Sequence, residues 1–203
     1  MYEDTATQAE IRALVSEVAA AEIAPNADRW NADHHAPIDC LRQLGALGVL
    51  GTIVPEPYGG AGLGASELAV VVEELARYDA GIAVAVAVHA GLMPVALANW
   101  GSDGQRERFL PGVARGDTLA AYCLTEPECG SDVSALRTTA RATDGGWTLH
   151  GSKTWITNGG FAEVMVVFAR DDRDYQVGAV LASVSSADAR FRSSDCTRRR
   201  PAS

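Results

Sequence analysis

The apolar positions in the first half of the chain recur every three or four residues, which is the spacing of a helix with one buried face. Pro25 cannot continue a helix, so we expect the first helix to span residues 7–25. Its apolar face consists of Ile11, Leu14, Val15, Val18, Ala19 and Ile23. The same pattern predicts helices over 37–47, 66–78 and 81–100, and a fifth after a capping box of Ser102 and Gln105.

The pattern changes near Asp117, after which short apolar segments alternate with turn residues. Asp-Gly-Gly at 144–146 predicts a hairpin turn, and Asn-Gly-Gly at 158–160 predicts a second turn of this kind. A block of helices followed by a block of strands favours an α+β fold with two domains over alternating βαβ units. Strands are predicted over residues 118–124, 135–143, 147–151, 153–157 and 162–170, with a fainter one at 177–184.

We divide the chain into a helical domain at residues 1–117, a β domain at 118–185 and a tail at 186–203. The tail has several arginines, few apolar residues and no periodicity, so we expect it to be disordered. A short arm that binds nucleic acid or a protein partner is the less favoured interpretation of the tail.

Charge and composition exclude some classes of function. The formal net charge is −9 and the pI is about 4.9, which argues against nucleic-acid binding as the main activity. Residues 81–100 are apolar but contain His89, Pro94 and Asn99, so we predict a buried helix rather than a membrane span. The acidic N-terminus does not look like a signal peptide and the four cysteines lack a CxxC spacing, so we expect a cytoplasmic protein with reduced thiols.

Residues 124–132, Leu-Thr-Glu-Pro-Glu-Cys-Gly-Ser-Asp, gather polar and conformationally special residues after a predicted strand. Thr125 and Ser131 supply hydroxyls, Pro127 stops the strand, and Gly130 allows a close approach of the backbone. Such a ledge of donors suits a flat heteroaromatic ring or a phosphate. An elaborate turn between two strands is an equally good interpretation of the composition.

The segment Lys-Thr-Trp-Ile-Thr-Asn-Gly-Gly at 153–160 provides a second candidate surface. In a strand, alternation would place Lys153, Trp155 and Thr157 on one face. The indole could then stack on a planar ligand and the hydroxyl could bond its edge. A core aromatic is the alternative role for Trp155.

Other signals of catalysis or metal binding are weak. The chain has no GxGxxG after a strand, no Walker A sequence and no GxSxG. His34 and His35 have no further ligand at a suitable spacing, and the adjacent Glu73 and Glu74 point in different directions on a helix. We therefore assign no catalytic residue and no metal ligand, and we interpret His89 as a core histidine.

Together, residues 121–140 and 149–170 closely resemble the acyl-CoA dehydrogenase family, in which a TEP-x-x-GSD loop precedes a G-x-K-x-WITNG segment. The resemblance runs from about residue 8 to residue 170. It implies a helical N-terminal domain, a middle domain of antiparallel, barrel-like strands and a C-terminal four-helix bundle. It also implies that FAD binds between the middle domain and the bundle.

The resemblance further implies roles for single residues. Trp155 matches the residue against one flavin face, and Thr157 matches the hydroxyl at the reactive flavin nitrogen. Gly130 and Ser131 match positions near the flavin and the pantetheine chain of the substrate, so Ser131 is also a candidate substrate contact. The full set expected at the cofactor is Tyr122, Leu124, Thr125, Gly130, Ser131, Trp155, Ile156 and Thr157.

The family reaction removes an α-proton from an acyl-CoA and transfers the β-hydrogen to the flavin as hydride. The resemblance implies an electron-transfer flavoprotein or a similar acceptor as partner, and a homo-oligomer for the full-length family. It places the glutamate base in the bundle, beyond residue 203. We therefore expect the chain to be inactive by itself, to hold FAD weakly, and to expose residues 162–170 as an aggregation-prone sheet edge.

Two alternatives remain open from the residues. The family pattern weakens after Arg170, which would fit a truncated or frameshifted gene, or one half of a split enzyme or interaction protein whose partner supplies the bundle. A related acyl-CoA oxidase or nitroalkane-oxidising flavoenzyme is the other alternative.

Overall fold

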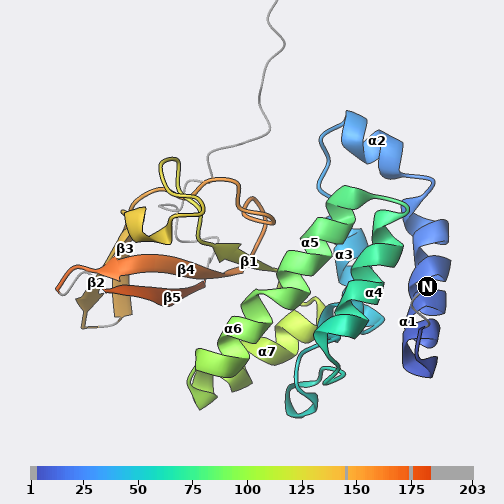
Figure 1. Ribbon diagram of the computed structural model, residues 1–203, viewed down its shortest axis with the longest axis horizontal. Helices are drawn as coiled ribbons and strands as arrows, with labels where there is room; N and C mark the ends of the chain where they lie inside the picture. Colours follow the sequence, from blue (N-terminus) through green and yellow to red (C-terminus); the bar gives the residue numbers. More distant parts are fainter. Residues whose placement is uncertain (1–3, 145, 174–175, 184–203) are drawn as a thin grey trace, which may run out of the picture. The chain divides into compact units, whose positions relative to one another are not determined.

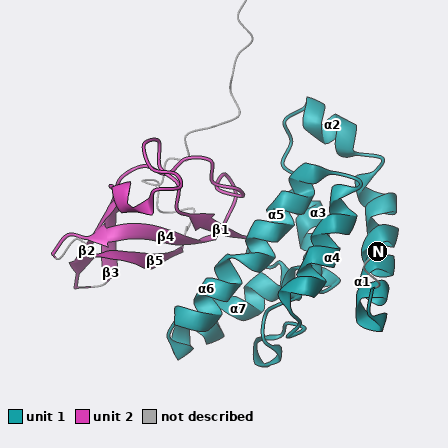
Figure 2. Cartoon of the chain, viewed as in Figure 1, with its two compact units in different colours: residues 1–119 teal, residues 120–203 magenta. Residues whose placement is uncertain are grey.

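The computed structural model describes residues 4–144, 146–173 and 176–183, and the predicted tail at 186–203 lies outside these residues. The chain forms two compact units, Met1–Leu119 and Ala120–Ser203 (Figure 2). The first unit is helical and the second contains a sheet, which confirms the predicted α+β order.

The predicted helices form in the first unit with three differences (Figure 1). The first ends in a π-helical turn, Ala19–Ile23, and a short helix that the pattern did not predict follows it. Residues 81–100 form two helices, because Pro94 has no N–H to donate and its ring clashes with the carbonyl four residues earlier. The helices are α1 (Ala6–Val18), α2 (Ala27–Ala32), α3 (Ile38–Ala46), α4 (Ala65–Ala76), α5 (Ala80–Gly91), α6 (Met93–Trp100) and α7 (Asp103–Arg115), with 3-10 turns at Val49–Gly51 and Glu56–Tyr58.

Two polar contacts tie the helices of this unit together. Glu74 of α4 is 1% exposed and pairs with Arg12 of α1 at 3.3 Å. His89 of α5 is also 1% exposed, and its Nε2 lies 3.0 Å from the carbonyl oxygen of Val113 on α7. This confirms His89 as a satisfied core histidine. The segment Ala80–Trp100 is long and apolar enough to cross a membrane, but half of it is buried inside the structure.

The second unit is a mixed, open sheet built around one central strand. Along one edge of β4, β1 pairs in parallel with residues 164–167 and β2 pairs in parallel with residues 170–171. β5 runs antiparallel along the other edge, and β2 and β3 form the hairpin predicted at 144–146. The strands are β1 (Ala120–Cys123), β2 (Thr139–Thr143), β3 (Gly146–His150), β4 (Val164–Asp171) and β5 (Val177–Ser183).

This topology corrects two expectations. The sheet contains both parallel and antiparallel pairs, so it is mixed and not purely antiparallel, and among the residues described it is open, as expected for an incomplete barrel. The segment 162–170 is not an exposed edge, because β4 is paired on both sides and Val164–Val167 are buried. When both faces of a strand are buried, consecutive residues are apolar. This explains why Val-Met-Val-Val shows no alternation of apolar and polar positions.

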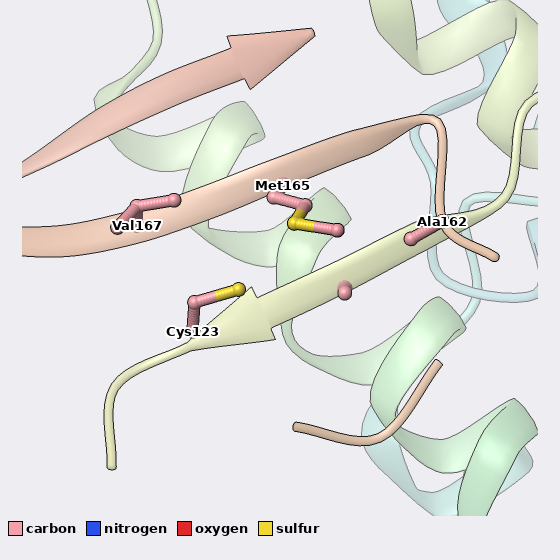
Figure 3. Close-up of a cluster of buried hydrophobic side chains, with 5 residues drawn as sticks. Cys123, Ala162, Met165 and Val167 are labelled. Atoms are coloured by element: carbon pink, nitrogen blue, oxygen red, sulfur yellow. The ribbon is translucent and has the colours of Figure 1, made fainter. Parts of the chain in front are cut away.

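One face of the sheet carries a small apolar core. Cys123 on β1 lies beside Met165 and Val167 on β4, with Ala162 just before that strand (Figure 3). The side chain of Ile156 packs against this cluster. Burial raises the pKa of the Cys123 thiol to about 11, so this cysteine is a core residue and not a nucleophile.

Candidate functional site

The loop that follows β1 is a tight turn with a fixed conformation. The backbone N–H of Glu126 donates to the carbonyl of Cys129 at 2.9 Å, and the N–H of Cys129 donates back at 3.2 Å. Pro127 and Glu128 occupy the exposed centre of this turn. Cys129 is 3% exposed, and its thiol donates to the carbonyl of Asp132. The segment therefore forms a turn, and hydrogen bonds within the turn fix which of its residues face outward.

Glu126 is the buried charge at the centre of this loop. Its side chain is 5% exposed and accepts hydrogen bonds from Lys153 Nζ at 2.8 Å, from the N–H of Arg137 at 2.7 Å, and from the N–H of Thr138 at 2.9 Å as well as its hydroxyl. Burial alone would raise the pKa of Glu126, but these donors outweigh it and lower the pKa to about 2. The carboxylate is therefore ionised across the physiological range.

The second motif is not the strand predicted at 153–157. Trp155 has a φ of 56°, in the left-handed region, where a strand cannot continue. The chain reverses at this residue, so the predicted shared face of Lys153 and Trp155 is wrong. The Lys153 side chain is 11% exposed and points inward to Glu126, whereas Trp155 is 79% exposed. The core-aromatic alternative for Trp155 is thereby excluded.

The structure brings the two motifs together through backbone and side-chain contacts. Lys153 Nζ donates to the carbonyl of Leu124 at 3.0 Å, and the N–H of Thr154 donates to the carbonyl of Thr125 at 2.9 Å. Farther along, Asn158 also has a left-handed backbone and is buried, and its Nδ2 donates to the carbonyl of Ala120 at 3.2 Å. Residues 155–157 are thus held at both ends against β1 and the loop that follows it.

The eight predicted cofactor residues all lie in β1, in the loop after it or in this second segment, but they are not equivalent. Tyr122 is half-buried with its ring 5.0 Å from that of Phe168, and burial raises the pKa of its phenol. Ile156 is half-buried, and its side chain packs against the core cluster. Leu124, Thr125 and Thr157 are half-buried, whereas Gly130, Ser131 and Trp155 are exposed.

Two observations indicate that this surface has capacity for a ligand. A methyl group added at Gly130 would meet no atom within 4 Å, so the fold itself does not require a glycine there. At position 151, by contrast, the fold does require a glycine, because the φ of Gly151 is 152° and the backbone of Thr138 lies where an added methyl group would be. Within the part of the chain that the structure describes, the hydroxyls of Thr125 and Thr157 have no hydrogen-bond partner.

The residues that hold the site together are not evident from the sequence. Residue types predict only a loop position for Glu126 and a turn position for Asn158, and strand alternation places Lys153 on the same face as Trp155. One feature of the sequence points to a special role for Lys153, because it is the only lysine among the 17 lysine and arginine residues. The partners of Lys153 lie 27 and 29 residues away in sequence, so no local pattern could identify them.

Comparisons with known proteins cover both units. The model of the acyl-CoA dehydrogenase N-terminal domain matches residues 5–117, and that of the acyl-CoA dehydrogenase middle domain matches residues 121–199. An acyl-CoA dehydrogenase of Bacillus subtilis (strain 168) is 37% identical over 165 residues, which are 81% of this chain and 44% of that protein.

Solved structures give the same result. Glutaryl-CoA dehydrogenase from Mycobacterium smegmatis is 36% identical with a TM-score of 0.82, over 89% of this chain and 46% of that chain. Acyl-CoA dehydrogenase complexed with FAD from Bacillus anthracis is 32% identical with a TM-score of 0.82, over 89% of this chain and 31% of that chain. The chain spans less than half the length of these relatives.

Proposed function

The chain belongs to the acyl-CoA dehydrogenase family, and we propose that its sheet unit forms one wall of an FAD site in an enzyme that oxidises acyl-CoA thioesters. The observation that carries this proposal is the junction of residues 124–126 with residues 153–154, which holds Trp155 exposed on a fixed backbone. The FAD bound to the relative from Bacillus anthracis supports the choice of cofactor.

The residues present fit a flavin. The 79% exposed indole of Trp155 offers an apolar face on which a flat ring can stack. The hydroxyls of Thr125 and Thr157, which have no hydrogen-bond partner among the described residues, are suited to bond the polar edge of that ring. The open space at Gly130 allows the ligand to approach the backbone, and Ser131 beside it would face the substrate. When bound, FAD would supply the acceptor for the hydride lost by the substrate.

The proton acceptor of the reaction belongs, in this proposal, to polypeptide outside residues 1–203. Among the described residues, Glu126 is the buried carboxylate of the site, and it is occupied by donors from Lys153, Arg137 and Thr138. A carboxylate with a pKa of about 2 is a poor base at neutral pH. Glu126 is therefore structural in this site.

A polypeptide of residues 1–203 alone is accordingly expected to be inactive. The measurement is anaerobic incubation of the purified chain with FAD, an acyl-CoA and an artificial electron acceptor. We expect no acceptor reduction above that of free FAD. Catalytic turnover by this chain would contradict the assignment of the base to other polypeptide.

The proposal also covers the electron acceptor, the oligomeric state and the cellular location of the enzyme. An electron-transfer flavoprotein or a similar protein would accept the electrons, and the whole enzyme would form a homo-oligomer, as the family resemblance implies. We also propose a cytoplasmic location; the buried thiols of Cys40, Cys123 and Cys129 would stay reduced in such a compartment.

One observation favours a second hypothesis, in which a separate chain supplies the part of the enzyme that carries the catalytic base. Val84 on α5, Leu92 between the two helices and Val95 on α6 are apolar and 51%, 43% and 36% exposed. This apolar row would pack against the polypeptide that carries the base, whether that polypeptide is continuous with this chain or separate. Co-purification with a second chain that restores acyl-CoA oxidation would establish the split form.

The experiment for the flavin site compares Trp155→Ala with Trp100→Ala. Both tryptophans are exposed, at 79% and 82%, and they lie in different units, so Trp100 is a matched control. Loss of the stacking surface at residue 155 should raise the Kd for FAD about tenfold or more, and loss of Trp100 should leave it unchanged. Fluorescence of added FAD reports the Kd, and equal Kd values for the two variants would refute the site.

A further inference from the structure

Lys153 is an unusual side chain in this protein. Arginine occupies every other basic position among the 17, yet a lysine stands at the one buried between the two motifs. An ammonium group is compact and can donate in several directions, whereas a guanidinium is a larger planar fork. Lys153 uses this property, because its Nζ donates to both Glu126 and the carbonyl of Leu124.

Compared with two apolar side chains at these positions, the ion pair of Lys153 and Glu126 adds little stability. Both side chains are almost buried, at 11% and 5% exposure, and burying two charges costs desolvation energy that offsets their attraction. Buried pairs of this kind contribute most clearly by selecting one arrangement of the chain. Here the arrangement selected is the register of residues 153–154 against residues 124–126.

Trp155 follows this junction directly and has a strained left-handed backbone. The N–H of Thr154 donates to the carbonyl of Thr125, and the side chain of Ile156 packs against the core cluster, so the backbone that carries the indole is held between two anchored neighbours. Breaking the ion pair would release the first of these anchors. The exposed indole would then sample several positions instead of one.

We infer that Lys153 and Glu126 are positioning residues that fix Trp155 and Thr157 relative to Thr125 before FAD binds. This inference rests on the proposed function, because it concerns the same flavin site. Neither residue touches the cofactor in this account. They strengthen FAD binding because the site residues are already ordered in the free protein, so less conformational entropy is lost when FAD binds.

The test uses the complete 203-residue chain and three groups of variants. Glu126→Gln and Lys153→Met each remove one charge of the pair, and the double variant removes both. Asp172→Asn is the matched control, since it is also a carboxylate-to-amide change and breaks the more exposed ion pair between Arg141 and Asp172 in the same unit. All measurements are made at a temperature at which circular dichroism shows every variant to be folded.

The first readout needs no cofactor. Because the chain has one lysine, amine acetylation followed by mass spectrometry reports Lys153 alone beside the N-terminus. We expect slow modification of Lys153 in the wild type and in Asp172→Asn, and modification at least about tenfold faster in Glu126→Gln. Equal rates in Glu126→Gln and the wild type would show that the pair does not hold Lys153 in place.

The second readout is FAD affinity, which a purely stabilising pair would not change far below the unfolding temperature. We expect the Kd to rise about tenfold in each single variant, to stay unchanged in Asp172→Asn, and to rise little further in the double variant, because the two residues act as one unit. If the wild type binds FAD and the single variants bind equally well, the positioning role is overturned and the flavin site stands. If the wild type binds no FAD, the proposed function fails first and this inference fails with it.

Discussion

At the scale of residues, the candidate site depends on a few side chains that are accessible at the surface and are not needed to stabilise the fold. Trp155 is strongly exposed in a backbone conformation that costs about 1–3 kcal/mol, and no contact within the described structure explains why a tryptophan stands there. Residue types in the two motifs predicted a ligand surface. The buried partners Glu126 and Asn158 could not be predicted, because their roles depend on contacts with distant parts of the sequence.

Gly130 gives a prediction that separates ligand binding from folding. A methyl group at this position meets no atom of the protein, so Gly130→Ala should change the free energy of unfolding by no more than about 1 kcal/mol. It should weaken FAD or acyl-CoA binding about tenfold if the ligand approaches the backbone there. Thermal unfolding and ligand titration together provide the measurement.

The control for this variant is Gly104→Ala in α7, where an added methyl group also meets no atom. That change should leave ligand binding unaltered. A Gly130→Ala variant that binds its ligands as tightly as the wild type would remove Gly130 from the site.

At the scale of elements, periodicity predicted the long helices and the hairpin, because these depend on local spacing and turn residues. It failed at residues 153–157, where β-forming residue types favoured a strand and the contacts of Lys153 and Thr154 with the preceding loop determine the path of the chain. It predicted the strand β4 correctly, but an apolar run does not reveal how many neighbours a strand has, so the pairing of β4 on both sides was not predicted. Both errors concern pairings between distant segments.

The ion pair that links these segments predicts a dependence of stability on pH. The pKa of Glu126 is about 2 in the folded protein and 4.5 as its ordinary value, so its ionised form stabilises the fold above about pH 4.5. This contribution, at most about 3 kcal/mol, should be lost progressively as the pH falls from about 4.5 to about 2. Denaturant unfolding of the wild type at several pH values measures the slope.

Glu126→Gln should have a flatter profile across this window and a lower stability at neutral pH. Asp171→Asn is a useful comparison, since the exposed guanidinium of Arg173 lowers the pKa of the half-buried Asp171 carboxyl to about 2 as well. Its profile should differ less from that of the wild type, because solvent screens an exposed pair. Identical slopes for Glu126→Gln and the wild type would mean that the buried carboxylate is not the titrating group.

At the scale of the whole molecule, the chain is two compact units whose sequences match two successive domains of acyl-CoA dehydrogenases. The family was predictable from the order and spacing of two motifs. The mixed open sheet was not, because strand order is set by pairing between segments that the sequence does not mark. The central claim at this scale is that residues 1–203 hold FAD through the sheet unit and do not by themselves perform the oxidation.

The most direct measurement of that claim is the absorbance spectrum of the purified chain as it elutes from a gel-filtration column equilibrated with FAD, because weakly held FAD stays bound under these conditions. We predict a flavin band that elutes with the wild-type protein, is reduced in Trp155→Ala, and is not bleached when an acyl-CoA is added without air. A wild-type protein that elutes with no flavin band above that of the column buffer would contradict the proposed cofactor site, and bleaching by acyl-CoA would contradict the placement of the base outside this chain.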